Sequence, residues 1–86
     1  MTDVEYQRWL RIRLSIAAYA YEIKADSIME DFQFDSLSLE VDTSIKTGNK
    51  KMDKFFETEF DPSTGQWIHK HPELKRIAEL YGKHYG

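Results

Sequence analysis

Residues 19–37, YAYEIKADSIMEDFQFDSL, join the aromatic-rich end of one helix to the acidic start of another through a short loop. Asp26 and Ser27 favour a turn there, because their side chains bond to nearby backbone groups. The carboxylates of Glu30 and Asp31 suit the positive end of a helix dipole, so a second helix is expected to begin at these residues. Two helices joined by so short a loop form an antiparallel hairpin. The stretch therefore predicts an all-α fold built on an N-terminal helical hairpin.

The first helix of this hairpin is predicted to run from Asp3 to Lys24 or Ala25. Thr2 and Glu5 have the spacing of a capping box, in which each side chain bonds to the backbone N–H of the other residue. Apolar residues follow at helical spacing. They predict one buried stripe, formed by Val4, Trp9, Ile12, Ile16, Tyr19 and Ile23 and broadened by Leu10, Leu14, Ala17, Ala18 and Tyr21.

The second helix is expected to reach about Val41, after which residues 42–49 form a polar connection. Thr47 is the candidate cap of a third helix over residues 50–59. This helix is amphipathic, because its apolar residues lie on one face. The residues of that face are Met52, Phe55, Phe56 and Phe60.

Residues 61–65, DPSTG, predict a turn, with Asp at its first corner, Pro at its second and Gly closing it. Trp67 is expected to cover the core. Pro72 stands where the first residue of a fourth helix would be, and Gly82 is a candidate stop. The inward face of this helix is predicted to consist of Leu74, Ile77, Ala78, Leu80 and Tyr81. The whole pattern indicates four helices, two of them within residues 43–86.

The composition of the 86 residues, of which 41% are hydrophobic, indicates one compact domain. The absence of Cys excludes a disulfide scaffold, a thiolate zinc site and thiol catalysis. The first residues lack the basic-then-apolar order of a signal peptide, and no apolar run approaches the roughly 18 residues that span a bilayer. These features predict a cytoplasmic protein with no membrane association.

The net charge of −3 disfavours strong binding to a nucleic-acid backbone. Two basic clusters are each expected to be a solvated helix face: Arg8, Arg11 and Arg13 in the first helix, and Lys50, Lys51 and Lys54 in the third. An accessory protein that contacts DNA through these residues is therefore the least favoured interpretation.

Signals for catalysis are weak. Gly48 and Gly65 stand alone, so the chain has neither a phosphate-binding loop nor a dinucleotide fingerprint. His69 and His71, followed by Glu73, could face a metal from an extended segment, but a surface His pair is the commoner meaning of such spacing. No Ser stands beside an evident base. We expect no catalytic and no metal-binding residues.

The acidic helix start is more informative. Asp31 and Asp35 are four residues apart and share one face of the second helix, with Phe34 beside that face and Tyr21 across the loop. Such a notch suits a cationic aromatic ring, because ring faces attract positive charge and carboxylates accept hydrogen bonds from ribose hydroxyls. In the alternative interpretation, Asp31 caps the helix, Asp35 is solvated, and the two aromatic residues belong to the core.

The same stretch resembles the small N-terminal helical domain of bacterial NAD-dependent DNA ligases. The hallmark of that domain is an aromatic-rich helix end, a short loop and Asp-x-x-Tyr-Asp-x-Leu. Here the pattern reads Tyr19-x-Tyr21-Glu22, then Asp31-Phe32-Gln33-Phe34-Asp35-Ser36-Leu37, with Glu40 and Val41 continuing it, and the likeness covers residues 8–42. The ligase domain closes over the nicotinamide mononucleotide half of NAD. The resemblance thus implies that Tyr21, Asp31 and Asp35 bind this mononucleotide.

Two positions of the matching site depart from the family: Glu22 replaces a His, and Phe34 replaces a Tyr. The Lys-x-Asp-Gly motif of the ligase nucleophile is absent. We therefore expect a non-catalytic, standalone relative of the ligase domain that binds a nicotinamide nucleotide or acts with DNA-processing proteins. Its expected ligand is NAD or nicotinamide mononucleotide. Its cofactor-binding residues are expected to be Tyr21, Glu22, Asp31, Phe34 and Asp35. The alternative is a phage-type interaction module that shares only the fold and binds an unidentified protein partner.

Overall fold

A computed structural model of the chain describes residues 2–85, and these residues form the predicted all-α fold. The four predicted helices are present, together with a short 3-10 helix. Their bounds are α1 Asp3–Lys24, α2 Asp31–Ser38, α3 Lys50–Glu59, η1 Gln66–Lys70 and α4 Leu74–His84.

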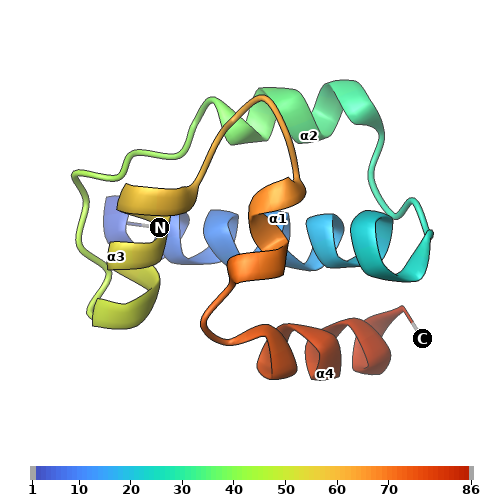
Figure 1. Ribbon diagram of the computed structural model, residues 1–86. Helices are drawn as coiled ribbons and strands as arrows, with labels where there is room; N and C mark the ends of the chain where they lie inside the picture. Colours follow the sequence, from blue (N-terminus) through green and yellow to red (C-terminus); the bar gives the residue numbers. More distant parts are fainter. Residues whose placement is uncertain (1, 86) are drawn as a thin grey trace.

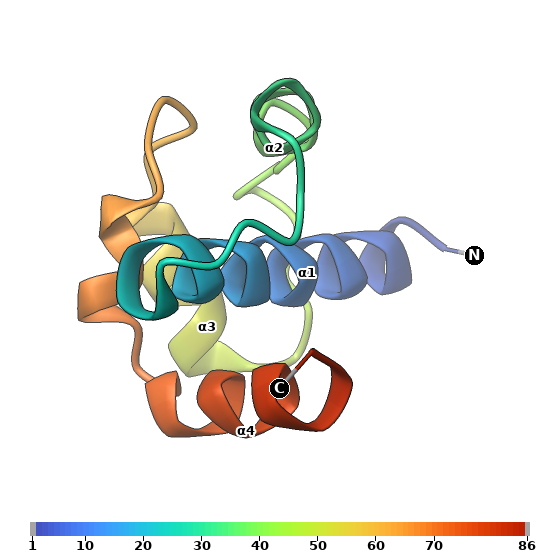
Figure 2. The same cartoon turned by 90° about the vertical axis from the view of Figure 1, so that its right-hand side faces the viewer.

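The long helix α1 lies at the centre of the fold and the other elements surround it (Figure 1). In Figure 2, α2 lies above α1, α4 lies below it, and α3 and η1 lie along one side. The polypeptide thus covers three sides of α1. Because α1 is central, it takes part in most of the contacts between elements, including those with α2, α4 and η1.

The antiparallel hairpin of α1 and α2 is confirmed in direction. The two helices run in opposite directions across Figure 1. In Figure 2, however, α2 is seen end-on while α1 is seen from the side, so the two helices cross obliquely. α2 ends at Ser38 rather than near Val41. Beyond Ser38 the chain tightens into turns, in which the N–H groups of Glu40 and Val41 bond to carbonyls three residues back.

Both ends of α1 lie where the sequence predicts them. The N–H of Glu5 donates to Oγ1 of Thr2 at 3.2 Å, and the N–H of Thr2 donates to Oε1 of Glu5 at 3.2 Å, which completes the capping box. At the other end, Ala25 takes a left-handed conformation with φ of 51°, and the N–H of Asp26 donates to the carbonyl of Ala20 at 2.9 Å. Residues with a Cβ atom are strained in this conformation, whereas Gly is not.

Replacing Ala25 by Gly is therefore expected to raise the free energy of unfolding by about 1 kcal/mol, because Gly adopts positive φ without steric cost. Urea unfolding followed by circular dichroism measures the change. Lys24→Gly is the matched control, since Lys24 still belongs to α1 and Gly there should lower stability by about 1 kcal/mol. Equal effects of the two substitutions would contradict the assignment of strain to Ala25.

The predicted buried stripe of α1 is partly wrong. Val4, Trp9 and Ile23 are exposed, and Tyr21 is 64% exposed. Six residues of the stripe are buried as predicted, and three polar residues are buried beside them. The six are Leu10, Leu14, Ile16, Ala17, Ala18 and Tyr19, and the three are Gln7, Arg11 and Ser15. The apolar pattern missed the three polar residues because they enter the interior, where segments distant in sequence supply hydrogen bonds.

The hydrophobic core lies between α1, α3, η1 and α4. Trp67 is buried, as predicted, and its Nε1–H donates to the carbonyl of Thr64 at 2.7 Å. The Trp67 ring lies 5.4 Å from the ring centroid of Phe56 and 5.3 Å from that of Phe60. Aromatic rings at these distances attract one another beyond their burial. This cluster joins α3 to η1.

Three further boundaries differ from the sequence prediction. The last helix begins at Leu74 and not at Pro72, which lies in the turn before it. Asn49, not Thr47, caps α3, because Oδ1 of Asn49 accepts the N–H of Met52 at 3.2 Å. The last helix continues through Gly82 to His84. The inward face of α4 is as predicted, with Ile77 buried and Leu74, Ala78, Leu80 and Tyr81 partly buried against the core.

Candidate functional site

The residues that the sequence indicates for a nucleotide site lie around one pocket, which we call the notch. Its volume is about 340 Å³, near the lower end of the range of about 300–1,000 Å³ that small-molecule pockets span. All five predicted residues are among those that line it: Tyr21, Glu22, Asp31, Phe34 and Asp35. A further wall comes from residues 64–66, at the end of the 61–65 turn.

The notch is narrow where the turn approaches the hairpin. A Cβ placed on Gly65 would lie 3.4 Å from Cβ of Ala18 and 3.7 Å from Cζ of Phe34. Ala17 and Ala18 line the notch on α1, and both are small and buried. The shape of the notch therefore depends on small residues on two elements that are more than forty residues apart in sequence.

The notch is strongly acidic. Glu22, Asp31 and Asp35 line it, and no Lys or Arg within residues 2–85 does. Glu22 accepts a hydrogen bond from Nε2 of Gln66, which ties α1 to the far wall. Three carboxylates without a neighbouring cation create a negative potential, which attracts cationic ligands and repels phosphate.

The aromatic residues of the notch differ in their surroundings. Phe34 is half-buried and packs against the core, so it belongs to the core and also to the notch wall. Tyr21 is 64% exposed and is not a core residue. Asp31 is the first residue of α2, and Glu30 before it makes no side-chain capping bond. The interpretation that assigned Asp31 to capping and Tyr21 to the core is therefore wrong for these two residues.

The two histidines do not form a metal site. His69 is exposed, whereas His71 is buried. Nδ1 of His71 accepts the N–H of Glu73 at 3.0 Å, so the ring proton resides on Nε2, which donates to Oγ of Ser15 at 3.2 Å. Burial holds the pKa of His71 at about 4, against a smaller opposite effect of the Glu73 charge. No group of three metal-ligating side chains occurs within residues 2–85.

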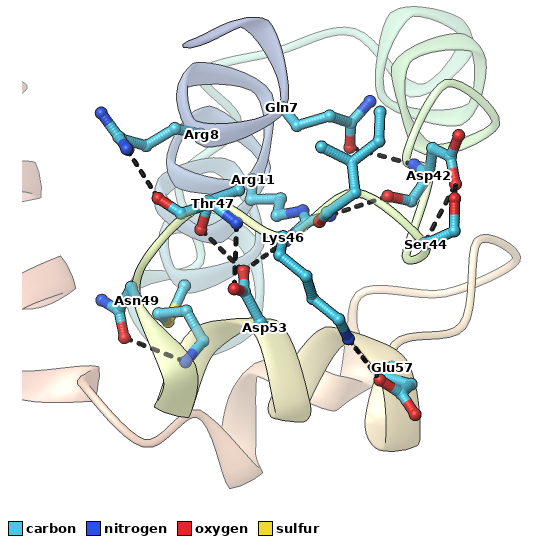
Figure 3. Close-up of polar contacts among 12 residues, drawn as sticks. Gln7, Arg8, Arg11, Asp42, Ser44, Lys46, Thr47, Asn49, Asp53 and Glu57 are labelled. Atoms are coloured by element: carbon cyan, nitrogen blue, oxygen red, sulfur yellow. Dashed lines mark hydrogen bonds and ion pairs between the residues drawn. The ribbon is translucent and has the colours of Figure 1, made fainter. Parts of the chain in front are cut away.

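A buried ion pair that sequence reasoning missed lies beside this histidine. Nη1 of Arg11 donates to Oδ1 of Asp53 at 2.9 Å, and both side chains are less than a tenth exposed. Nη2 of Arg11 donates to the carbonyls of Asp42 and Ile45 at 2.8 and 2.9 Å. Figure 3 shows Arg11 reaching from α1 to Asp53 on α3. The expectation that Arg11 lies on a solvated face is thus wrong.

The same network holds the connection between α2 and α3. Thr47 donates to Asp53 twice, from its N–H at 2.9 Å and from its hydroxyl at 2.6 Å (Figure 3). Burial raises the pKa of Asp53, but the hydrogen bonds from Thr47 and the charge of Arg11 outweigh it, and the pKa lies below its usual value. Nε2 of Gln7 also donates to the carbonyl of Glu40 at 2.9 Å. Asp53 had no signal in the sequence beyond its place in an amphipathic helix.

One exposed apolar surface lies near the notch. Phe32 and Leu39 are 70% and 77% exposed, and they stand seven residues apart at the two ends of α2. Residues at this spacing share one helix face. α2 therefore presents apolar side chains outward as well as toward α1.

Comparison of the chain with protein-family models, curated proteins and solved structures found no match. Within residues 2–85, every helix is too short or too polar to cross a membrane.

Proposed function

We propose that this protein is a non-catalytic binding module whose notch holds the nicotinamide and ribose of a nicotinamide nucleotide. One observation carries the proposal: the five residues chosen from the sequence line a single pocket of about 340 Å³. The resemblance of residues 8–42 to the nucleotide-binding domain of NAD-dependent DNA ligases supports the choice of ligand.

The negative charge of the notch narrows the choice of ligand. A nicotinamide ring attached to ribose is cationic and planar, so Tyr21 and Phe34 can contact its faces while carboxylates accept the ribose hydroxyls. The phosphate of the mononucleotide meets the negative potential of Glu22, Asp31 and Asp35. Nicotinamide riboside, which lacks this phosphate, should therefore bind more tightly than nicotinamide mononucleotide or NAD.

Titration of each of these three compounds, followed by amide chemical shifts, tests the proposal. We expect saturable shifts at Tyr21, Asp31 and Asp35 with nicotinamide riboside at millimolar concentration. Asp35→Asn should weaken binding by about tenfold, the effect of losing one charge-assisted hydrogen bond. Glu30→Gln is the control, because Glu30 is exposed, precedes Asp31 and does not line the notch.

Two outcomes would count against this ligand. If millimolar riboside shifts none of the three amides, the notch does not bind the nicotinamide group. If Glu30→Gln weakens binding as much as Asp35→Asn does, the attraction comes from the general negative charge of α2 and not from a defined pocket.

A second candidate function, a protein-interaction module, is favoured by the exposed Phe32 and Leu39. Isolated surface apolar residues are ordinary, but Phe32 near the start of α2 and Leu39 just after its end stand seven residues apart and suit a partner's groove. Replacement of both by Ser should abolish co-purification of a defined partner and leave nicotinamide riboside binding unchanged. Retention of the partner by the double variant would remove this candidate.

A nucleic-acid role has less support. Arg11 is buried, and Nη2 of Arg8 donates to the carbonyl of Thr47 at 2.6 Å, so the basic cluster of α1 is not a free row of cations. Lys50, Lys51 and Lys54 remain exposed on α3. Binding through these three lysines alone would have a shallow dependence on salt.

A further inference from the structure

A second cavity, independent of the notch, lies between α1, α3 and α4. Its volume is about 310 Å³. We call it the basic cavity, because Arg8, Arg11 and Arg76 line it and Glu73 is its one carboxylate within residues 2–85. A chain with a net charge of −3 thus places three guanidinium groups around one cavity.

The charges around the basic cavity do not cancel. Arg11 is neutralised by Asp53, at 2.9 Å. Arg76 lies 3.8 Å from Glu73, which is longer than a hydrogen bond, and the other oxygen of Glu73 accepts Nδ2 of Asn49 at 2.9 Å. Arg8 is in no ion pair in the part of the chain that the structure describes. Among the arginines that line the cavity, Arg8 is therefore without an ion-pair partner.

Below these charges the cavity is apolar. Ile12, Met52, Ile77 and Leu80 line it, and Met52 and Ile77 are buried. His71 also lines the cavity and is neutral at pH 7, since its pKa is about 4, so it adds no charge. Gly48 stands beside Arg8, and a Cβ there would lie 4.0 Å from Nη2 of Arg8. Small-molecule sites combine an apolar lining with a few polar groups in this way.

We propose that the basic cavity binds a small organic phosphate monoester, with the phosphate between Arg8 and Arg76 and the organic part against Ile12, Ile77 and Leu80. Guanidinium groups bind phosphate through paired, charge-assisted hydrogen bonds. A phosphate dianion can accept hydrogen bonds from both arginines and balance both charges, whereas a carboxylate balances the charge of only one. The volume of about 310 Å³ is sufficient for a phosphate group and one aromatic ring.

The test uses the full chain and follows amide shifts at Gly48 and Ile77 during titration with phenyl phosphate. We expect saturable shifts, with weaker binding of inorganic phosphate and of benzoate. Arg76→Gln should weaken phenyl phosphate binding by about tenfold. The side chain of Arg76 is 64% exposed, so this substitution leaves the core intact. The shifts should be absent at Tyr21, Asp31 and Asp35, which separates this site from the notch.

Two variants make the result specific. Glu73→Gln should tighten phenyl phosphate binding several-fold, because it removes the one carboxylate of the cavity while keeping an oxygen for Asn49. Lys75→Gln removes the same charge as Arg76→Gln from the neighbouring exposed residue, which does not line the cavity, and should change little.

The proposal is overturned if phenyl phosphate produces no saturable shift at millimolar concentration. It is also overturned if Lys75→Gln weakens binding as much as Arg76→Gln, since diffuse surface charge then explains the attraction. Inorganic phosphate binding as tightly as phenyl phosphate would show that the apolar walls do not contact the ligand. Benzoate binding more tightly would exclude the phosphate monoester.

Discussion

Replacing Asp53 by Ala is expected to lower the free energy of unfolding by about 3–5 kcal/mol, the usual cost of leaving one partner of a buried ion pair uncompensated. The side chain of Arg11 is 2% exposed and would retain its charge without a carboxylate. The N–H and hydroxyl of Thr47 would lose their acceptors as well. A domain of this size has a total stability of about 4–13 kcal/mol, so the substitution is expected to remove a large part of it.

Urea unfolding of the two chains at pH 7 measures this effect. Asp42→Ala is the matched control, because the exposed carboxylate of Asp42 bonds only to Ser44, while its backbone carbonyl still accepts Arg11. The free energy of unfolding of Asp42→Ala should be lower than that of the unmodified chain by less than about 1 kcal/mol. A loss below about 1 kcal/mol in Asp53→Ala would show that water or a rearranged loop replaces the carboxylate.

The second large effect is a dependence of stability on pH that arises from His71. Its pKa is about 4 in the folded chain and about 6.5 in an unfolded one. Between these values the unfolded chain binds more protons, so the contribution is fully present above pH 6.5 and is lost as the pH falls toward 4. The expected loss is about 3 kcal/mol by pH 4.

Burial is the main cause of the lowered pKa, and the hydrogen bonds of the ring leave no place for a second proton. Protonation would place a hydrogen on Nδ1, which accepts the N–H of Glu73, so two donors would face each other. Nε2 already donates to Ser15, whose hydroxyl donates to the carbonyl of Arg11 at 2.7 Å. No acceptor in this chain of bonds is left for a second ring proton.

His71→Gln separates this effect from the protonation of carboxylates. The amide nitrogen of Gln can still donate to Ser15, but the side chain does not titrate. Unfolding free energies measured across this pH range should fall much less steeply in the variant than in the unmodified chain. His69→Gln, at an exposed position, should leave the slope unchanged. A steep slope in His71→Gln would assign the pH dependence to other groups.

Features that depend on neighbouring residues were predicted well from the sequence. The capping box of Thr2 and Glu5, the end of α1 near Ala25 and the acidic start of α2 depend on interactions within a few residues. The clustering of Asp31, Phe34 and Asp35 was also predictable, because a helix places residues three and four apart on one face. The wall at residues 64–66 was not, since it joins the notch only through tertiary packing.

The cap of α3 was misassigned for a related reason. Thr47 was predicted as the cap, although Asn49 directly precedes Lys50, the first residue of α3. In the structure Asn49 accepts the N–H of Met52, and the hydroxyl of Thr47 donates to Asp53. Thr47 therefore satisfies the buried carboxylate that pairs with Arg11, a role that the local pattern does not reveal.

The sequence by itself determined that this chain forms helices, where most of them begin and end, and which residues gather at the hairpin. Only the tertiary structure decided which face of α1 is buried. Arg11 was expected on a solvated face, and Gln7 and Ser15 lie outside the predicted apolar stripe, yet partners 42, 33 and 56 residues away bond to them. A polar side chain enters the interior only when such partners meet it there, and no local pattern contains that information.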